Sequence, residues 1–313
     1  MTKARAKSGP VAAIDCGTNT IRLLIARGDA DGGLVDLDRR QEIVRLGQGV
    51  DATGEFHPDA LSRTFAAVDS YAAAIAAAGV PVGAVRLVAT SAARDARNRD
   101  DFFRGICSRL GVEAAVISGR REAELSFSGA LSRLQPAEPV LVMDIGGGST
   151  ELIVGTAAGG IEQAASIDVG SVRLTERLLG AGPPSSAAVE QTRDYVDSHL
   201  AAAGLDLSRV SSWIGVAGTV TTLAALHLGL GDRDRVHGRT LDQAALRGLL
   251  AQLSALTATE IRAMSGIHPQ RADVITAGAL IATRVAVAVP AAELLVSESD
   301  LLDGIALELL SQP

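Results

Sequence analysis

The sequence of 313 residues has few of the residues that build disulfide-linked, zinc-binding or membrane-spanning proteins. Its two cysteines, Cys16 and Cys107, lie 91 positions apart, a spacing that predicts neither a disulfide framework nor a metal-binding motif. The most apolar long stretch, residues 274–290, contains Arg284 and is shorter than a bilayer span. The basic segment 1–10 precedes only a strand-sized apolar run, so no signal peptide is expected. We therefore expect a soluble, cytoplasmic protein with no membrane partner.

Aromatic residues are also scarce, at 3% of the chain, whereas apolar residues make up 47%. The cores must therefore be built from Ala, Val, Leu and Ile, and a chain of this length fits two domains of about 150 residues each. The formal net charge of −7 argues against non-specific nucleic-acid binding. It does not exclude a polyanionic ligand, because binding depends on the local field of a site rather than on overall charge.

Strands and helices alternate along the chain in a way that predicts an α/β fold. Residues 35–37 and 42–46 predict two short strands, and an Ala-rich helix is expected from Pro58 to about Ala78. Residues 171–179 and 269–288 each predict one continuous helix.

The pattern of the first forty residues restarts in the middle of the chain. At an offset of 129 residues, Asp15 aligns with Asp144 and Arg22 with Glu151, and the flanking apolar runs align as well. Self-similarity of this kind predicts one fold used twice. We expect a first domain at 1–128, completed by a C-terminal helix at 299–313, and a second domain at 129–298.

The strongest chemical signal is the segment Asp144-Ile-Gly-Gly-Gly-Ser-Thr-Glu151. Three glycines in a row allow backbone N–H groups to converge on an anion, and two flanking carboxylates suit a hard divalent cation. The candidate phosphate-binding residues of this loop are Gly146, Gly147, Gly148, Ser149 and Thr150. The alternative is a glycine-rich hairpin turn with solvated acids on either side.

Weaker signals of the same kind occur elsewhere. The first half has a matching polar turn, and Arg94 follows a buried strand, where α/β proteins place ligand contacts. A third small-residue turn precedes a helix, and Arg271 lies near another helix start. The further candidate phosphate-binding residues are Gly17, Thr18, Asn19, Thr20, Arg22, Arg94, Gly218, Thr219 and Arg271. The arginines could equally be solvated surface charges, and Cys16 is expected to be a small core residue rather than a nucleophile.

Glu122 lies in the first turn of a predicted helix, beside an apolar stripe. An acid at this position is favoured by the helix dipole without any function.

Taken together, these residues resemble the exopolyphosphatase and guanosine-pentaphosphate phosphohydrolase family, which belongs to the actin-like ATPase superfamily. The resemblance runs nearly end to end and rests on the segments IDCGTNTIRLLIA, VATSAARDARN, ISGRREAELSFSGA, VMDIGGGSTELIV, VAGTVTTLAAL and HPQRADVITAGALI. It implies two ribonuclease-H-like domains that face each other across a cleft, and a homodimer.

The resemblance also implies a role for each candidate residue. Glu122 matches the glutamate that activates the attacking water. Asp144 and Glu151 match the acids that bind Mg²⁺ or Mn²⁺, and we add Asp15 as a third candidate ligand. The two hairpin turns match the phosphate-binding loops, whereas Arg22, Arg94 and Arg271 match arginines that contact phosphate.

Two positions depart from the family pattern. Arg121 stands where the family often has a second acid, and Asp300-Leu-Leu-Asp303-Gly304 replaces the usual Gly-Leu-Arg-Glu-Gly. The chain also leaves no room for the helical C-terminal domains of longer members, which favours short polyphosphate chains as substrates.

The predicted function is therefore a metal-dependent exopolyphosphatase, an enzyme that hydrolyses a phosphoric anhydride bond. Three alternatives stay open. One is hydrolysis of guanosine pentaphosphate. Another is a kinase or nucleotide-driven ATPase in which Asp15 is the key carboxylate. The last is a non-catalytic sensor of polyphosphate or of a phosphorylated guanosine nucleotide.

Overall fold

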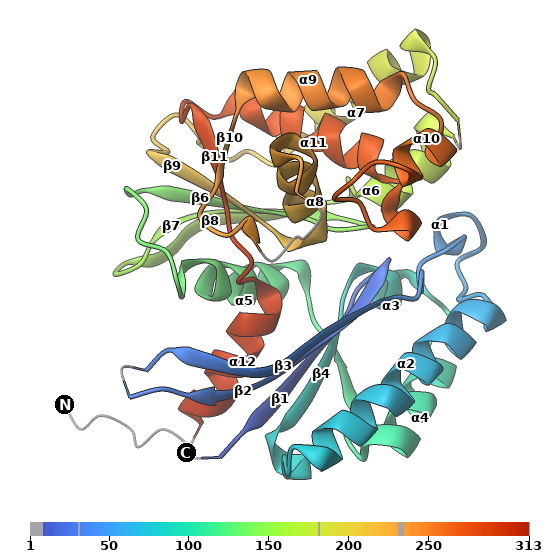
Figure 1. Cartoon of the computed structure of the whole chain (residues 1–313), viewed down its shortest axis with the longest axis vertical. Helices are drawn as coiled ribbons and strands as arrows, with labels where there is room; N and C mark the ends of the chain where they lie inside the picture. Colours follow the sequence, from blue (N-terminus) through green and yellow to red (C-terminus); the bar gives the residue numbers. More distant parts are fainter. Residues whose placement is uncertain (1–8, 31, 181, 231–234, 313) are drawn as a thin grey trace. The chain divides into compact units, whose positions relative to one another are not determined.

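The computed structural model describes residues 9–30, 32–180, 182–230 and 235–312 (Figure 1). The chain divides into two compact units, unit 1 with Met1–Arg133 and Leu301–Pro313, and unit 2 with Leu134–Asp300. The predicted boundary at 128/129 falls inside helix α5 (Gly119–Leu131), which ends before the division between the units. Residues 1–8, for which no signal peptide is predicted, lie outside the described part. Among the described residues, no helix is long and apolar enough to cross a membrane.

Unit 1 contains a five-stranded sheet with the order β3-β2-β1-β4-β5. Its strands are β1 (Val11–Cys16), β2 (Thr20–Gly28), β3 (Leu34–Ile43), β4 (Val85–Ala89) and β5 (Ala114–Val116). The first three are antiparallel, whereas β4 and β5 continue the sheet in parallel with β1. All six residues of β1 are buried, as expected for a central strand. The prediction of two short strands at 35–37 and 42–46 is wrong, because the polar residues between them pair with β2 along the exposed sheet edge.

The helices of unit 1 cover both faces of this sheet (Figure 1). They are α1 (Val50–Thr53), α2 (Pro58–Ala77), α3 (Ser91–Asp95), α4 (Arg99–Leu110), α5 and α12 (Leu301–Ser311). Helix α2 packs against α4, and α12 packs against α5, β1 and β2.

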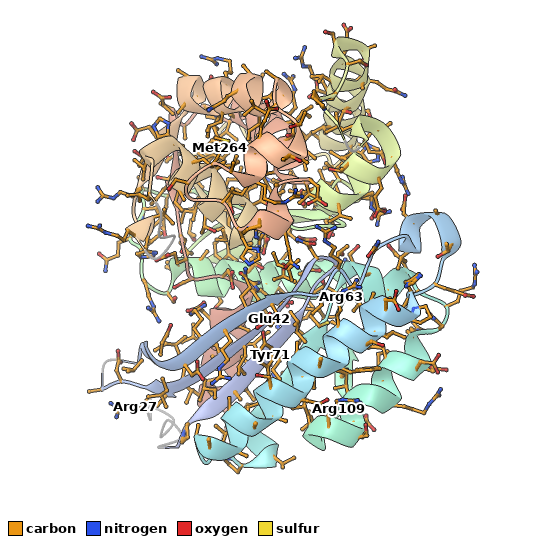
Figure 2. All side chains as sticks on the ribbon, turned by 45° about the vertical axis from the view of Figure 1, so that its right-hand side comes forward. Arg27, Glu42, Arg63, Tyr71, Arg109 and Met264 are labelled. Atoms are coloured by element: carbon orange, nitrogen blue, oxygen red, sulfur yellow. The ribbon has the colours of Figure 1, made fainter. Side chains whose placement is uncertain are left out.

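Side chains of α2 fasten that helix to the sheet and to its neighbour. The Tyr71 hydroxyl donates to Ile21 O at 3.0 Å, and the Arg63 Nε donates to Val44 O at 2.9 Å. Burial, with the charge of Glu42 adding to it, raises the pKa of Tyr71 well above its ordinary value. Figure 2 labels Glu42, Arg63 and Tyr71. It also labels Arg109, whose guanidinium lies 4.5 Å from the Phe65 ring centroid.

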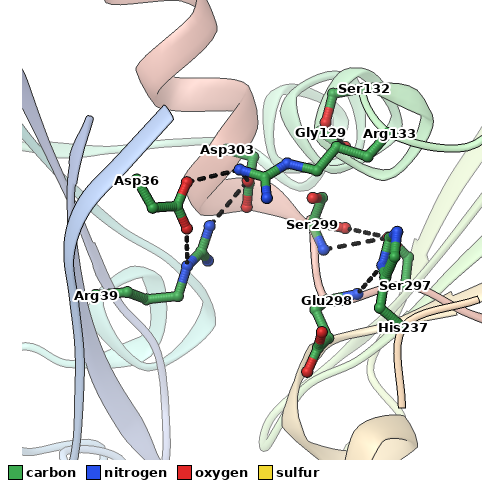
Figure 3. A network of polar contacts seen from close by, with 10 residues as sticks. All are labelled: Asp36, Arg39, Gly129, Ser132, Arg133, His237, Ser297, Glu298, Ser299 and Asp303. Atoms are coloured by element: carbon green, nitrogen blue, oxygen red, sulfur yellow. Dashed lines mark hydrogen bonds and ion pairs between the residues drawn. The ribbon is translucent and has the colours of Figure 1, made fainter. Parts of the chain in front are cut away.

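A charged network joins β3, the end of α5 and the start of α12 in unit 1 (Figure 3). Arg39 donates to Asp36 and to the fully buried Asp303, both at 2.9 Å. Arg133 donates to Asp36 at 2.6 Å and lies 3.8 Å from Asp303. Burial acts to raise the pKa of Asp36, but Arg39 and Arg133 outweigh it, so the pKa lies below its ordinary value of 3.8.

Unit 2 contains a six-stranded sheet with the order β10-β11-β9-β6-β7-β8. Its strands are β6 (Val140–Ile145), β7 (Thr150–Thr156), β8 (Gly160–Ile167), β9 (Ser212–Val216), β10 (Thr240–Asp242) and β11 (Glu293–Val296). Without β10, this order repeats that of unit 1. The pairing of β6 with β7 also repeats that of β1 with β2, residue by residue at an offset of 129. The predicted α/β fold of two ribonuclease-H-like domains is confirmed.

The helices of unit 2 are α6 (Ser171–Leu174), α7 (Ser186–Ala202), α8 (Ala217–Leu228), α9 (Gln243–Ser254), α10 (Ala258–Arg262) and α11 (Ile275–Ala288). Helix α8 packs on β6, β9, β10 and β11, and α11 packs on α6, α7, α8 and α9. Beyond β11, the His237 Nδ1 accepts a hydrogen bond from Glu298 N at 3.2 Å (Figure 3).

Two predicted helices of unit 2 differ from the structure. Helix α6 widens into a π-helical turn at Thr175–Leu179, which Gly180 N closes by donating to Thr175 O. The segment 269–288 is not one helix, because a short 3₁₀ turn at Pro269–Arg271, capped by the His268 side chain, is separated from the next helix by residues 272–274, where Val274 has a φ of −119°. Helix α11 begins only after this turn.

Candidate active site

The hairpin of β6 and β7 in unit 2 brings two acids together. Asp144 and Glu151 occupy opposite positions of the antiparallel pair and are only 6% and 1% exposed. The Ser166 hydroxyl, on β8, donates to Glu151 Oε1 at 2.8 Å. Carboxylates directly opposite each other repel, and a buried position strengthens the repulsion. A divalent cation bound by the pair would relieve it.

The residues present fit a hard divalent cation. Among the described residues, no group of three or more His, Cys, Asp or Glu side chains could hold a metal. Two carboxylates are the number that Mg²⁺ usually takes from a protein, because waters and phosphate oxygens complete its coordination. Asp144 and Glu151 would hold such an ion in unit 2.

The glycine loop between these acids is tightly closed. Gly146 N donates to Ser149 O at 3.0 Å, and the buried Thr150 hydroxyl donates to Val169 O at 2.5 Å. The Thr150 hydroxyl hydrogen therefore braces the loop and is not offered to an anion. The Ser149 side chain is 3% exposed.

Arg271 lies against the start of α8, beside Gly218, which is another candidate phosphate-binding residue. A Cβ atom at Gly218 would lie 2.1 Å from Arg271 Nη2, so only glycine leaves room for the guanidinium. The preceding residue, Ala217, has a φ of 63°, a conformation that is costly for a residue with a side chain. The Thr219 hydroxyl donates to Ile145 O at 2.9 Å and so ties α8 to the strand before the glycine loop.

The matching hairpin in unit 1 forms an ion pair. Arg22 donates from Nε and Nη2 to Asp15 Oδ2, at 3.1 and 2.7 Å. Both side chains are mostly buried, at 15% and 7% exposure. The candidate metal ligand Asp15 and the candidate phosphate-binding Arg22 therefore contact each other.

The turn of this hairpin is closed in the same way as the glycine loop. Gly17 N donates to Thr20 O at 2.9 Å, and the turn carbonyls of Thr18 and Asn19 accept from backbone amides of residues 44–47. Thr18 and Asn19 are 9% and 6% exposed.

The candidate base Glu122 and the candidate phosphate ligand Arg94 also contact each other in unit 1. Arg94 Nη1 donates to Glu122 Oε2 and to Ile117 O, both at 2.9 Å. Glu122 is 7% exposed. Arg94 lies in the short helix α3 rather than in a loop. The charge-assisted hydrogen bond fixes the orientation of the Glu122 carboxylate.

Comparison with known proteins assigns the chain to a family. The family model described as the Ppx/GppA phosphatase family matches residues 24–312. Exopolyphosphatase 2 of Mycobacterium tuberculosis is 44% identical, over 96% of this chain and 98% of its own length. The chain belongs to the Ppx/GppA phosphatase family.

Solved structures related to this Ppx/GppA chain have the same fold. A crystal structure of an exopolyphosphatase-like protein, 40% identical, has a TM-score of 0.90 and covers 96% of this chain and 97% of its own. A crystal structure of an exopolyphosphatase from Cytophaga hutchinsonii, 28% identical, has a TM-score of 0.85 and covers 94% of this chain and 96% of its own.

The two departures from the Ppx/GppA pattern both involve the terminal helix α12. Arg121 contacts this helix, and Asp303 lies in it. Arg121 forms ion pairs with Glu308 of α12 and with Glu124, at 3.1 Å for the latter. Asp303 belongs to the network with Arg39 described above. These residues therefore stabilise the packing of α12 in unit 1.

The interpretation of Cys16 as a core residue is confirmed. Its side chain is 1% exposed in the unit 1 core. Burial, with the charge of Asp15 adding to it, raises the pKa of the Cys16 thiol far above its ordinary value, so the thiol stays protonated.

Sequence reasoning missed residues that support the two loops of this Ppx/GppA protein. Ser166 donates to Glu151, and Arg173 Nε donates to Gly148 O at 2.7 Å. The internal repeat contains the signal that could have found Arg173. In each unit a segment that follows the third strand contacts the turn of the first hairpin. These segments are Arg45-Leu-Gly in unit 1 and Gly170-Ser-Val-Arg in unit 2.

Proposed function

We propose that this protein is a metal-dependent exopolyphosphatase that hydrolyses the terminal phosphate of inorganic polyphosphate, with a preference for short chains. Membership of the Ppx/GppA phosphatase family supports a phosphate-releasing reaction, and relatives named exopolyphosphatase support the substrate. The observation that carries the proposal is the buried pair of Asp144 and Glu151 beside the glycine loop. Two carboxylates and a turn of glycine amides suit a phosphate chain that carries a divalent cation.

Each candidate residue has its own task in the proposed reaction. Glu122 accepts a proton from the attacking water, and Arg94 orients its carboxylate. The loop at 146–150 binds the terminal phosphate, and Arg271 neutralises charge on its oxygens. Mg²⁺ or Mn²⁺ held by Asp144 and Glu151 would, when bound, supply further charge neutralisation at these oxygens.

The alternative functions have less support. In a kinase or nucleotide-driven ATPase Asp15 would be the key carboxylate, but here Arg22 holds it in an ion pair. A sensor without activity was suggested by Arg121 and the altered segment at 300–304. Arg121 and Asp303 both take part in ion pairs at α12, which gives these two residues a structural role. Homodimerisation, a cytoplasmic location and the choice of metal stay predictions.

The substrate is tested by following phosphate release from tripolyphosphate, long-chain polyphosphate and guanosine pentaphosphate in parallel. We expect release from tripolyphosphate to be fastest and to stop when the divalent cation is chelated. Faster release from guanosine pentaphosphate would move the substrate assignment to that nucleotide. No release from any of the three would contradict the proposed function.

The catalytic assignment is tested by Glu122→Gln, with Glu124→Gln as a matched control on the same helix. Loss of a general base typically lowers the rate by about 10²- to 10⁴-fold, and we expect a fall in kcat within this range. The control removes a half-exposed partner of Arg120 and Arg121 and should leave kcat within about twofold. A kcat for Glu122→Gln close to that of the control would show that Glu122 is not the base.

A further inference from the structure

The carbonyl groups of the glycine loop in unit 2 are all held by one segment, the residues that follow β8. The donors are the Ser171 amide and hydroxyl to Gly146 O (2.9 and 3.2 Å), the amides of Val172 and Arg173 to Gly147 O (2.9 and 3.0 Å), and the Arg173 Nε to Gly148 O (2.7 Å). The three amides belong to the first turn of α6, where helical N–H groups have no partner within the helix. The loop and the segment therefore satisfy each other's backbone groups.

This arrangement decides where the loop amides point. In a trans peptide unit, the carbonyl of one residue and the N–H of the next point in opposite directions. Because the carbonyls of residues 146–148 point toward α6, the N–H groups of residues 147–149 point away from it. Three successive N–H groups turned to one side form the concave surface that binds an anion.

Arg173 makes the one contact of this set in which a charged side chain takes part. Its side chain is 10% exposed, and the guanidinium donates to a backbone carbonyl in a charge-assisted hydrogen bond. Asp168, 3.7 Å from Arg173 Nη2, is itself 74% exposed. Glycine has the greatest backbone freedom of any residue, so three in a row need such contacts to keep one conformation.

Gly170 allows the segment to approach the loop this closely. A Cβ atom at this position would lie 2.3 Å from Gly147 O and 2.4 Å from the carbonyl carbons of Gly147 and Gly148. Any larger residue would push the loop away from α6. Gly170 and Arg173 therefore act on the same two carbonyl groups, those of Gly147 and Gly148, by different means.

We propose that Arg173 is a positioning residue that, with the close approach at Gly170, holds the loop amides of residues 147–149 in the orientation that binds the terminal phosphate. The proposal rests on the proposed function for the identity of the anion. The loop binds phosphate both in the substrate complex and in the transition state. Loss of its orientation should therefore raise KM more than it lowers kcat.

The test compares Arg173→Ala, Arg173→Lys and Gly170→Ala in steady-state hydrolysis of tripolyphosphate. We expect Arg173→Ala and Gly170→Ala to lower kcat/KM by about 10- to 100-fold, mainly through KM, the range that a lost charge-assisted hydrogen bond gives. Arg173→Lys keeps a donor and should recover part of the loss. The controls are Arg177→Ala, an exposed arginine in the next turn, and Gly248→Ala, an exposed glycine with open space around it.

Amide hydrogen exchange gives a readout that does not need turnover. Both test variants should speed exchange in peptides covering residues 146–150 and 171–173, relative to the two controls. Values of KM and exchange rates equal to those of the controls would overturn the proposal, as would a loss of activity explained by a lowered Tm alone. A wild-type protein without hydrolysis would contradict the proposed function, whereas the exchange rates would still decide the role of Arg173.

Discussion

In unit 1 the hairpin of β1 and β2 pairs Asp15 with Arg22, whereas in unit 2 the hairpin of β6 and β7 places Glu151 opposite Asp144 at the same register position. The strand pairing of the two hairpins is the same, and within the paired residues one side chain differs in charge. The first hairpin sets an arginine against its acid, and the second sets two buried carboxylates opposite each other. A divalent cation is therefore expected in unit 2 and not in unit 1.

The two turns differ in a second way. The turn of unit 1 contains Thr18 and Asn19, whose side chains limit the backbone, and backbone amides of residues 44–47 hold its carbonyls. The turn of unit 2 contains three glycines and is held by an arginine side chain as well. The glycine-rich loop of unit 2 is thus held by its neighbouring segment. The internal repeat keeps its backbone pairing while its side chains change.

The largest expected effect comes from making the second hairpin like the first. In Glu151→Arg the new arginine should pair with Asp144, as Arg22 pairs with Asp15. We expect kcat/KM for tripolyphosphate to fall about a thousandfold, because metal-binding charge is removed, while Tm stays within a few degrees because repulsion is replaced by attraction. Glu162→Arg, at an exposed position of β8, is the control and should keep its activity. Retained activity in Glu151→Arg would show that the carboxylate pair is not needed.

A smaller effect is expected when the ion pair of unit 1 is broken. Arg22→Met leaves Asp15 buried without its guanidinium, which should lower the free energy of unfolding by about 3 kcal/mol in urea denaturation. The control is Arg27→Met at the exposed end of the same strand, where the change should stay within about 0.5 kcal/mol. The double variant Asp15→Asn/Arg22→Met should recover part of the loss. Equal stabilities of Arg22→Met and the control would mean that the pair contributes nothing.

The smallest expected effect concerns the edge strand of unit 1. Asp36 takes part in the network with Arg39 and Arg133, whereas β8 of unit 2 has Ile161 at the matching position of the strand pairing. Because the pKa of Asp36 is lowered, its contribution to stability is complete above pH 3.8 and is lost as the pH falls through the lowered value. Asp36→Asn should therefore flatten the loss of stability in acid unfolding below about pH 4. If Asp36→Asn lost stability in acid as steeply as the wild type, the network with Arg39 and Arg133 would not favour the charged form of Asp36.

The parts of the fold that follow from local pattern were predicted from the sequence. Helix α2 is found at the residues predicted from Pro58 to about Ala78, because Pro58 opens it and its alanines favour a helix. The repeat was also predicted, since Asp15 and Asp144 lie in matching contexts. Helix α3 was missed because five residues are too few to show a helical period.

The contacts within the candidate site were harder to predict. Arg94 and Glu122 are separated in sequence, and their ion pair depends on how α3 and α5 pack. Arg173 was missed because it binds a backbone carbonyl, which leaves no complementary residue type in the sequence. The helix expected at 269–288 is interrupted at residues 272–274, a local change of backbone conformation that the apolar pattern does not show.

The central claim, that the second hairpin and not the first binds the divalent cation, is tested most directly by Mn²⁺ titration followed by electron paramagnetic resonance. The proteins compared are the wild type, Glu151→Gln and Asp15→Asn. The account predicts that Glu151→Gln weakens Mn²⁺ binding at least about tenfold, whereas Asp15→Asn leaves it within about threefold. Loss of binding in Asp15→Asn together with full binding in Glu151→Gln would contradict it.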